Sequence, residues 1–135
     1  MFQDKLRPIS TLKTEISQIR TVKKGETIGY GRKGKAVDDL TIATIAIGYA
    51  DGFNRAFSNG KIAANVQGKP APVIGNICMD MSMIDVTGIA VKEGDEVIIF
   101  GENPTIQELA SAIGTIPYEI LTNVSERVKR VYFAE

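Results

Sequence analysis

The side chains of this sequence that could do acid–base chemistry are tyrosines. Tyr30 and Tyr49 share one setting, IGYG and IGYA, in which isoleucine and glycine precede the tyrosine and a small residue follows. Each follows a segment rich in β-branched residues, so both phenols are expected at strand ends near loops. Most tyrosines are half-buried aromatics with a solvated hydroxyl, and the pattern alone favours that structural role for both.

The residue types that other kinds of active site need are missing or poorly placed. The sequence contains no histidine, which removes the commonest general base, the commonest metal ligand and every Ser-His or Cys-His pair. Cys78 is the single cysteine and is expected to be a small core residue rather than a nucleophile. Asp80 and Asp85 would point to opposite faces of a strand. GYGRKG (residues 29–34) lacks phosphate-loop spacing, so a plain loop is expected there. Catalysis would have to use Tyr, Lys, Arg or carboxylates, and no metal is expected.

The composition is that of one ordinary globular domain of 135 residues, with 44% hydrophobic and 24% charged residues. Sixteen Lys and Arg balance sixteen Asp and Glu, which argues against a nucleic-acid or membrane-surface partner. No apolar run approaches the roughly 20 residues that span a bilayer, and the first residues lack the apolar core of a signal peptide. A cytoplasmic location is therefore expected.

The spacing of glycine and proline along the sequence indicates a β-rich architecture in a single domain, residues 1–135. Segments rich in β-branched residues alternate with glycine and proline turns, a spacing typical of an all-β barrel or sandwich. Residues 32–39 are expected to be a loop. The expected strands cover residues 8–22, 27–30, 40–47, 61–67, 71–77, 81–87, 96–100 and 128–133.

One helix is well signalled near the C-terminal end. Thr105 and Glu108 have the spacing of a capping box, and Gly114 stands where a C-terminal cap belongs. The apolar residues between them fall on one helical face: Ile106, Leu109, Ala110 and Ile113. A second short helix or a loop is expected over residues 117–123.

Six ordered segments resemble the C-terminal domain of pyridoxal-phosphate alanine racemases over nearly the whole chain. They are LRPISTLKTEI, GETIGYGRKG, ATIAIGYADGFNRAFSNG, KPAPVIGNICMDMSMIDVT, KEGDEVIIFG and GTIPYEILTNVSERVKRVY. The resemblance implies a mainly β domain, a Greek-key-like barrel with one or two short helices near its C-terminus. In that family an N-terminal (β/α)8 barrel, absent here, holds pyridoxal phosphate on a lysine. The enzyme is a head-to-tail homodimer, and each active site combines one subunit's barrel with the other's β domain.

The resemblance also gives Tyr30 a catalytic role. Racemisation of an amino acid held as an aldimine needs a proton donor or acceptor on each face of the α-carbon. In the family the cofactor lysine serves one face and the tyrosine of the GYG segment, here Tyr30, serves the other. Since a phenol has a pKa of about 10, groups that favour the phenolate are expected from the partner's barrel.

Further site positions follow from the same resemblance. Tyr49 matches the tyrosine beside the substrate carboxylate, and Met79 matches the position whose backbone N–H contacts that carboxylate. The remaining matches line or support the entrance corridor: Tyr118, Ile116, Arg55 and Asp80. For Arg55 a solvated loop charge, and for Asp80 a structural carboxylate, are equally compatible with the sequence. Many members have Arg where this chain has Asn76, which leaves the corridor's outer charge pair in doubt.

Three functions are compatible with these residues. The first is the β domain of an alanine racemase that supplies D-alanine for bacterial peptidoglycan, with a small amino acid as substrate. The second is a relative that prefers serine or another amino acid. The third is a stand-alone domain with a binding or assembly role, against which the joint presence of Tyr30, Tyr49 and Tyr118 argues. We expect the chain to be an excised domain that is inactive by itself.

Overall fold

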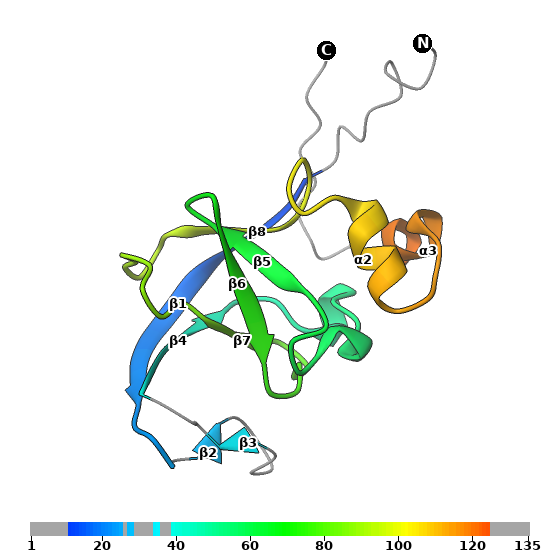
Figure 1. Ribbon diagram of the computed structural model, residues 1–135. Helices are drawn as coiled ribbons and strands as arrows, with labels where there is room; N and C mark the ends of the chain where they lie inside the picture. Colours follow the sequence, from blue (N-terminus) through cyan, green and yellow to red (C-terminus); the bar gives the residue numbers. More distant parts are fainter. Residues whose placement is uncertain (1–10, 26, 29–33, 36–38, 125–135) are drawn as a thin grey trace.

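The computed structural model describes residues 11–25, 27–28, 34–35 and 39–124 of the chain. Six antiparallel strands close into a barrel in the order β1-β4-β7-β6-β5-β8 (Figure 1). They are β1 (Leu12–Val22), β4 (Leu40–Ile45), β5 (Ala63–Val66), β6 (Lys69–Ile74), β7 (Ser82–Asp85) and β8 (Glu96–Phe100). Beside the barrel, β2 (Thr27–Ile28), which lies in the strand expected over residues 27–30, pairs with β3 (Gly34–Lys35). Strand β3 falls in the segment 32–39 that was expected to be a loop. The predicted β-barrel class is confirmed, and of the two architectures that the pattern allowed, the barrel is the correct one.

The barrel interior is filled by the β-branched residues that define the strands in the sequence. Strand β7 alternates buried and half-buried residues, as expected of a strand with one face in the core. Strand β4 instead buries Ile42, Ala43 and Ile45 completely, which matches its nearly continuous apolar sequence. Apolar burial of this kind, at about 25 cal/mol per Å², is the main force that holds a barrel closed.

The hairpin between β5 and β6 is tighter than the sequence indicated. The turn was predicted over residues 68–70, but Lys69 already pairs with Val66 in the ladder. Gln67 and Gly68 alone make the turn, with φ angles of 54° and 80°. Positive φ at both central residues is the geometry that matches the twist of a two-residue hairpin, so the strand begins two residues earlier than predicted.

Two helices follow the barrel strands, as expected. Helix α2 (Ile106–Ala112) is capped by Thr105, whose side chain accepts a hydrogen bond from the Glu108 amide at 3.2 Å. Helix α3 (Pro117–Asn123) begins with proline at its first turn. The strand predicted over residues 128–133 lies outside the described residues. None of the described helices is long and apolar enough to cross a membrane.

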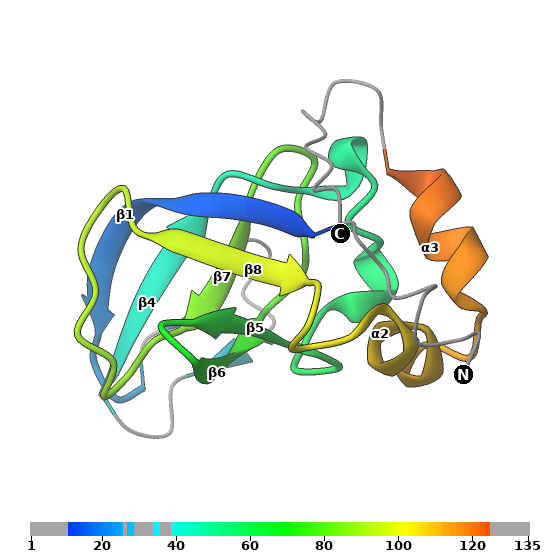
Figure 2. The same cartoon turned by 90° about the horizontal axis from the view of Figure 1, so that it is seen from above.

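The connection from β4 to β5 does not join neighbouring strands, and it carries two short 3-10 helices across one end of the barrel. These are η2 (Tyr49–Asp51) and η3 (Arg55–Phe57). Figure 2 shows this connection next to α3, at the barrel end opposite the loop between β7 and β8. The contact with α3 is close, since a Cβ added to Gly52 would lie 2.2 Å from the Asn123 carbonyl oxygen. Tyr49, the predicted site residue of the IGYADG segment, therefore lies at this end of the barrel.

Candidate functional site

Two loops from distant parts of the sequence are joined along their main chains at this end of the barrel. The Tyr49 amide donates to the Cys78 carbonyl oxygen, and the Ala50 amide donates to the Met79 carbonyl oxygen, each at 2.9 Å. Gly48 permits this approach, because a Cβ at that position would lie 2.2 Å from the Cys78 oxygen. We call residues 47–52 and 77–82 the clamped loops. They bring the backbones of Tyr49 and Met79 close together.

The turn that presents Tyr49 is fixed from inside. The carboxylate of Asp51 is 8% exposed and accepts a hydrogen bond from the Gly48 amide at 2.9 Å. Gly52 then adopts a left-handed conformation with φ of 100°, and its amide returns to the Tyr49 carbonyl oxygen. The turn leaves Tyr49 43% exposed.

Arg55 lies against Tyr49. Its guanidinium carbon is 5.7 Å from the centroid of the Tyr49 ring, within the range of a cation–π contact. Helix η3, which carries Arg55, is held on both sides: Asn54 caps it by accepting from the Ala56 amide at 2.8 Å, and Phe57 stacks on Phe53 in the core. The structure thus brings together two residues that the sequence assigned to the substrate site and the entrance.

Helix α3 presents the predicted corridor residues outward. Ile120 is buried and anchors the helix, whereas Tyr118 is 71% exposed and Ile116, at the N-cap, is 61% exposed. Thr115 and Glu119 are hydrogen-bonded through their side chains at 2.7 Å, which ties the first turn together. The two predicted residues therefore face away from the domain's own core.

The exposed large apolar side chains of the described part of the chain all belong to these segments. They are Tyr49, Met79, Met81, Ile116, Tyr118 and Leu121. Large apolar side chains that a folded domain leaves exposed are candidates for contact with a ligand or another polypeptide. We call these six residues the apolar face. Sequence reasoning missed Met81 and Leu121. Met81 could have been found from its place two residues after Met79, and Leu121 from its place on the same helix as Tyr118.

The backbone around Met79 is suited to an acceptor ligand. Among the described residues none accepts a hydrogen bond from the Met79 amide, while the neighbouring Cys78 amide is satisfied by the Met81 carbonyl oxygen at 3.0 Å. Cys78 itself is partly buried rather than a core residue. A backbone N–H in an exposed loop can donate to a carboxylate.

Asp80 and Asn76, two positions singled out in the sequence, lie near Met79 in the chain. Asp80 is exposed and directly follows Met79. The Asn76 side chain accepts a hydrogen bond from the Asn59 side chain at 3.1 Å, so an amide pair occupies the place where many family members have Arg. Tyr30, the predicted catalytic residue, lies outside the described residues.

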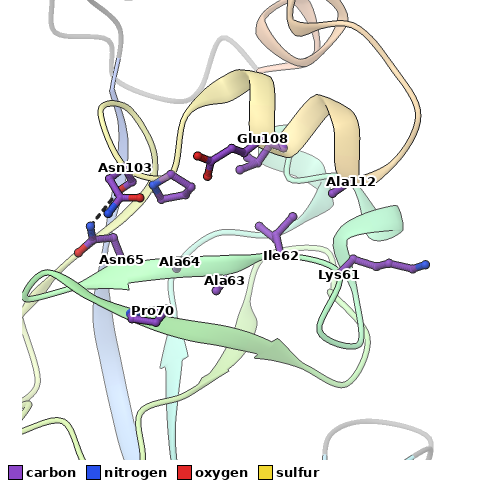
Figure 3. A pocket seen from close by; sticks show the side chains of 11 residues that line it. Lys61, Ile62, Ala63, Ala64, Asn65, Pro70, Asn103, Glu108 and Ala112 are labelled. Carbon is purple, nitrogen blue, oxygen red and sulfur yellow. Dashed lines mark hydrogen bonds between the residues drawn. The ribbon is translucent and has the colours of Figure 1, made fainter.

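A separate pocket of about 360 Å³ lies between β5 and α2 (Figure 3). Its lining includes Lys61, Asn65, Asn103 and Glu108, and none of the predicted site residues. Asn65 donates to the Asn103 carbonyl oxygen at 2.8 Å and accepts from the Gly68 amide at 2.8 Å, so its amide is used in local structure. The clamped loops, not this pocket, carry the candidate site.

Fold and site together place the chain among the β domains of racemases. The solved alanine racemase of Clostridium difficile 630 superposes with a TM-score of 0.86 at 43% identity, over 95% of this chain and 34% of that one. The crystal structure of alanine racemase from Bartonella henselae with covalently bound pyridoxal phosphate superposes with a TM-score of 0.84 at 34% identity, over 90% and 34%.

A comparison with protein families narrows this class to one family. Residues 9–132 match the family described as "Alanine racemase, C-terminal domain", and the chain belongs to it. It is 48% identical over 132 residues to alanine racemase 1 of Clostridium acetobutylicum, a match that covers 94% of this chain and 34% of that protein. The resemblance seen in the sequence is thereby confirmed. The chain spans about a third of the length of the curated relatives that it matches.

Proposed function

We propose that this chain is the β domain of an alanine racemase that interconverts L- and D-alanine and supplies D-alanine for bacterial peptidoglycan in the cytoplasm. Membership of the family supports this proposal, as does 48% identity to a curated alanine racemase. The single observation that carries it is the pair of clamped loops, which brings the exposed residues Tyr49 and Met79 into two segments joined by main-chain hydrogen bonds.

The cofactor belongs to a second domain. Every lysine whose side chain is described is exposed, and among the described residues no lysine lies in an enclosed site that could hold pyridoxal phosphate. The described residues therefore do not fit the role of cofactor anchor, which the family assigns to the N-terminal barrel. When bound by an enzyme, the group acts as an electron sink that makes an α-proton removable.

The chain's own contribution to proton transfer is Tyr30. In the sequence this residue lies between β2 and β3, in the GYG segment that carries the family's tyrosine. Its phenol would hold or accept the proton on one face of the substrate's α-carbon. A base with an ordinary pKa of about 10 needs neighbouring cations or hydrogen-bond donors to work near neutral pH, and the partner subunit's barrel would supply them.

Substrate recognition uses the clamped loops. The Met79 amide would donate to the substrate carboxylate, and the exposed Tyr49 ring, held by Arg55, would lie beside it. Tyr118 and Ile116 would narrow the entrance corridor. Steric discrimination of this kind amounts to about 1–3 kcal/mol per methylene, so alanine is favoured over serine without an absolute exclusion of serine.

The apolar face is the surface that meets the rest of the enzyme. Large exposed apolar groups such as Met79, Met81 and Leu121 are stabilised when another polypeptide covers them. In the proposed homodimer the partner subunit's N-terminal barrel covers this face, which closes the active site and excludes water from it.

A hybrid protein tests the proposal. In it, this chain replaces the matching third of the Clostridium acetobutylicum relative, so that an N-terminal domain is supplied. We expect the hybrid to bind the cofactor, to dimerise and to racemise L- and D-alanine, with serine a poorer substrate. A folded, cofactor-loaded dimer without alanine racemisation would contradict the proposal, and faster turnover of serine would reassign the substrate.

A further inference from the structure

The buried polar side chains of the described part of the chain are concentrated around the clamped loops. They are Asp51 at 8% exposure, Ser58 at 7% and Ser82 at 1%. Asp51 accepts from the Gly48 amide, and the Ser82 hydroxyl donates to the Ile47 carbonyl oxygen. Each of these bonds ends on the main chain of the loop that carries Tyr49.

Ser58 acts on the other loop. Its hydroxyl oxygen accepts a hydrogen bond from the Ile77 amide at 2.9 Å, in a buried setting. Its own amide donates to the Arg55 carbonyl oxygen at 3.0 Å, which ends η3. Next to it, the Asn59 amide donates to the Gly75 carbonyl oxygen at 2.9 Å. Ser58 therefore links η3, the helix of Arg55, to the loop segment that precedes Met79.

We propose that Ser58 is a positioning residue for the substrate carboxylate site. By holding Ile77 it sets the position of the Cys78 and Met79 carbonyl oxygens, and through them the amides of Tyr49 and Ala50. The functional part of this inference rests on the proposed function, because the carboxylate site is the one assigned there to Met79.

Removing one partner of a buried hydrogen bond costs more free energy than the bond itself contributes, because the other partner is left buried and unsatisfied. Replacing Ser58 with alanine leaves the Ile77 amide buried without an acceptor, which favours movement of the loop toward water. A loop that no longer holds the Met79 amide weakens substrate binding more than it affects the proton-transfer step at Tyr30. A general loss of stability would instead lower the amount of active enzyme, and so kcat, without changing KM.

The kinetic test uses Ser58→Ala in the hybrid protein, with Ser17→Ala as the control. Ser17 makes one exposed bond, from its hydroxyl to the Thr44 carbonyl oxygen, on the barrel wall. We expect Ser58→Ala to raise KM for alanine at least tenfold with less than a threefold change in kcat, and Ser17→Ala to change neither. Equal KM values in Ser58→Ala and the unmodified hybrid would overturn the proposal.

A second measurement does not depend on activity or on the proposed function. Amide hydrogen exchange in the 135-residue chain reports the Tyr49 amide, which bonds across the clamp but does not touch Ser58. We expect its exchange to be at least tenfold faster in Ser58→Ala than in Ser17→Ala, and unchanged exchange would overturn the positioning role. If Ser58→Ala does not fold, Ser58→Cys places a slightly larger thiol, which is a weaker acceptor, at the same position. It should give a smaller increase in both quantities, and unaltered values would again overturn the proposal.

Discussion

The Tyr49 amide lies 2.9 Å from the Cys78 carbonyl oxygen, and this hydrogen bond is one of those that connect the two segments that carry the candidate site. A parallel bond from Ala50 to Met79 prevents the loops from pivoting about it. The backbones of Tyr49 and Met79 therefore keep a fixed relation, and any change that separates the loops acts on both at once.

Gly48 is the residue whose replacement tests this relation. Its backbone is extended, with φ of −145°, so alanine meets no conformational strain there, only the Cys78 and Met79 carbonyl oxygens at 2.2 and 2.4 Å from the new Cβ. We expect Gly48→Ala to lower the free energy of unfolding by at least about 2 kcal/mol, as overpacking does, and to reduce kcat/KM in the hybrid. Thermal unfolding and alanine racemisation measure the two effects.

Gly88→Ala is the control for that variant. Gly88 has φ of 82° with nothing within 4 Å, so its replacement introduces backbone strain of about 1–2 kcal/mol in a turn away from the clamped loops. It should lower stability while kcat/KM is retained. An unaltered unfolding temperature for Gly48→Ala, or equal loss of kcat/KM in both variants, would contradict the account of the clamp.

Arg55 is expected to orient the Tyr49 ring rather than to stabilise the fold. An exposed cation–π contact is worth about 0.5–1 kcal/mol, so Arg55→Ala should reduce stability by no more than that. In the hybrid we expect KM for alanine to rise about twofold to fivefold with kcat retained, because the ring becomes free to turn. Lys69→Ala, which removes an exposed charge from β6, should leave both constants unchanged. Equal KM values in the two variants would show that Arg55 does not act on Tyr49.

The carboxylate of Asp95, at the end of the barrel opposite the clamped loops, makes the stability of the fold depend on pH. Asp95 accepts hydrogen bonds from the Lys92 side chain and amide, both at 2.9 Å, and these hold its pKa below the usual value of 3.8. A lowered pKa means that the stabilisation is present above about pH 4 and is lost as the pH falls through the folded-state value. Denaturant unfolding between pH 2.5 and pH 7 should show Asp95→Asn less stable than the unmodified chain at neutral pH, with the difference closing below pH 4. Glu93→Gln is the neighbouring control, and a gap for Asp95→Asn that is constant with pH would contradict this interpretation.

The barrel strands and the helices could be predicted from the sequence because local patterns determine them. The alternation in β7 and the Thr105 cap of α2 are both readable from a few neighbouring residues. The β5–β6 turn was misplaced because it depends on a positive φ at Gln67. Glutamine is not a residue type that predicts this conformation. Local sequence also left open whether the sheet forms a barrel or a sandwich.

The candidate site depended on the resemblance, because its geometry is made by contacts between distant segments. No local pattern reveals that Gly48 packs on Cys78, or that buried Ser58 satisfies the Ile77 amide. Periodicity alone favoured a half-buried structural role for Tyr49, and the exposed ring beside Arg55 appears only in the folded chain. The roles of the site residues in catalysis stay predictions.

The central claim is that this chain supplies the proton-transfer group on one face of the substrate, and Tyr30→Phe tests it most directly. The change removes one hydroxyl and keeps the ring. The measurement is alanine racemisation in both directions by the hybrid protein and its variant, with cofactor content checked by absorbance. We predict that the variant binds the cofactor fully and loses at least about a hundredfold in kcat, the scale of a lost general acid–base group. Equal activity in the two proteins would contradict the account, and Tyr30 would then be an ordinary packed aromatic.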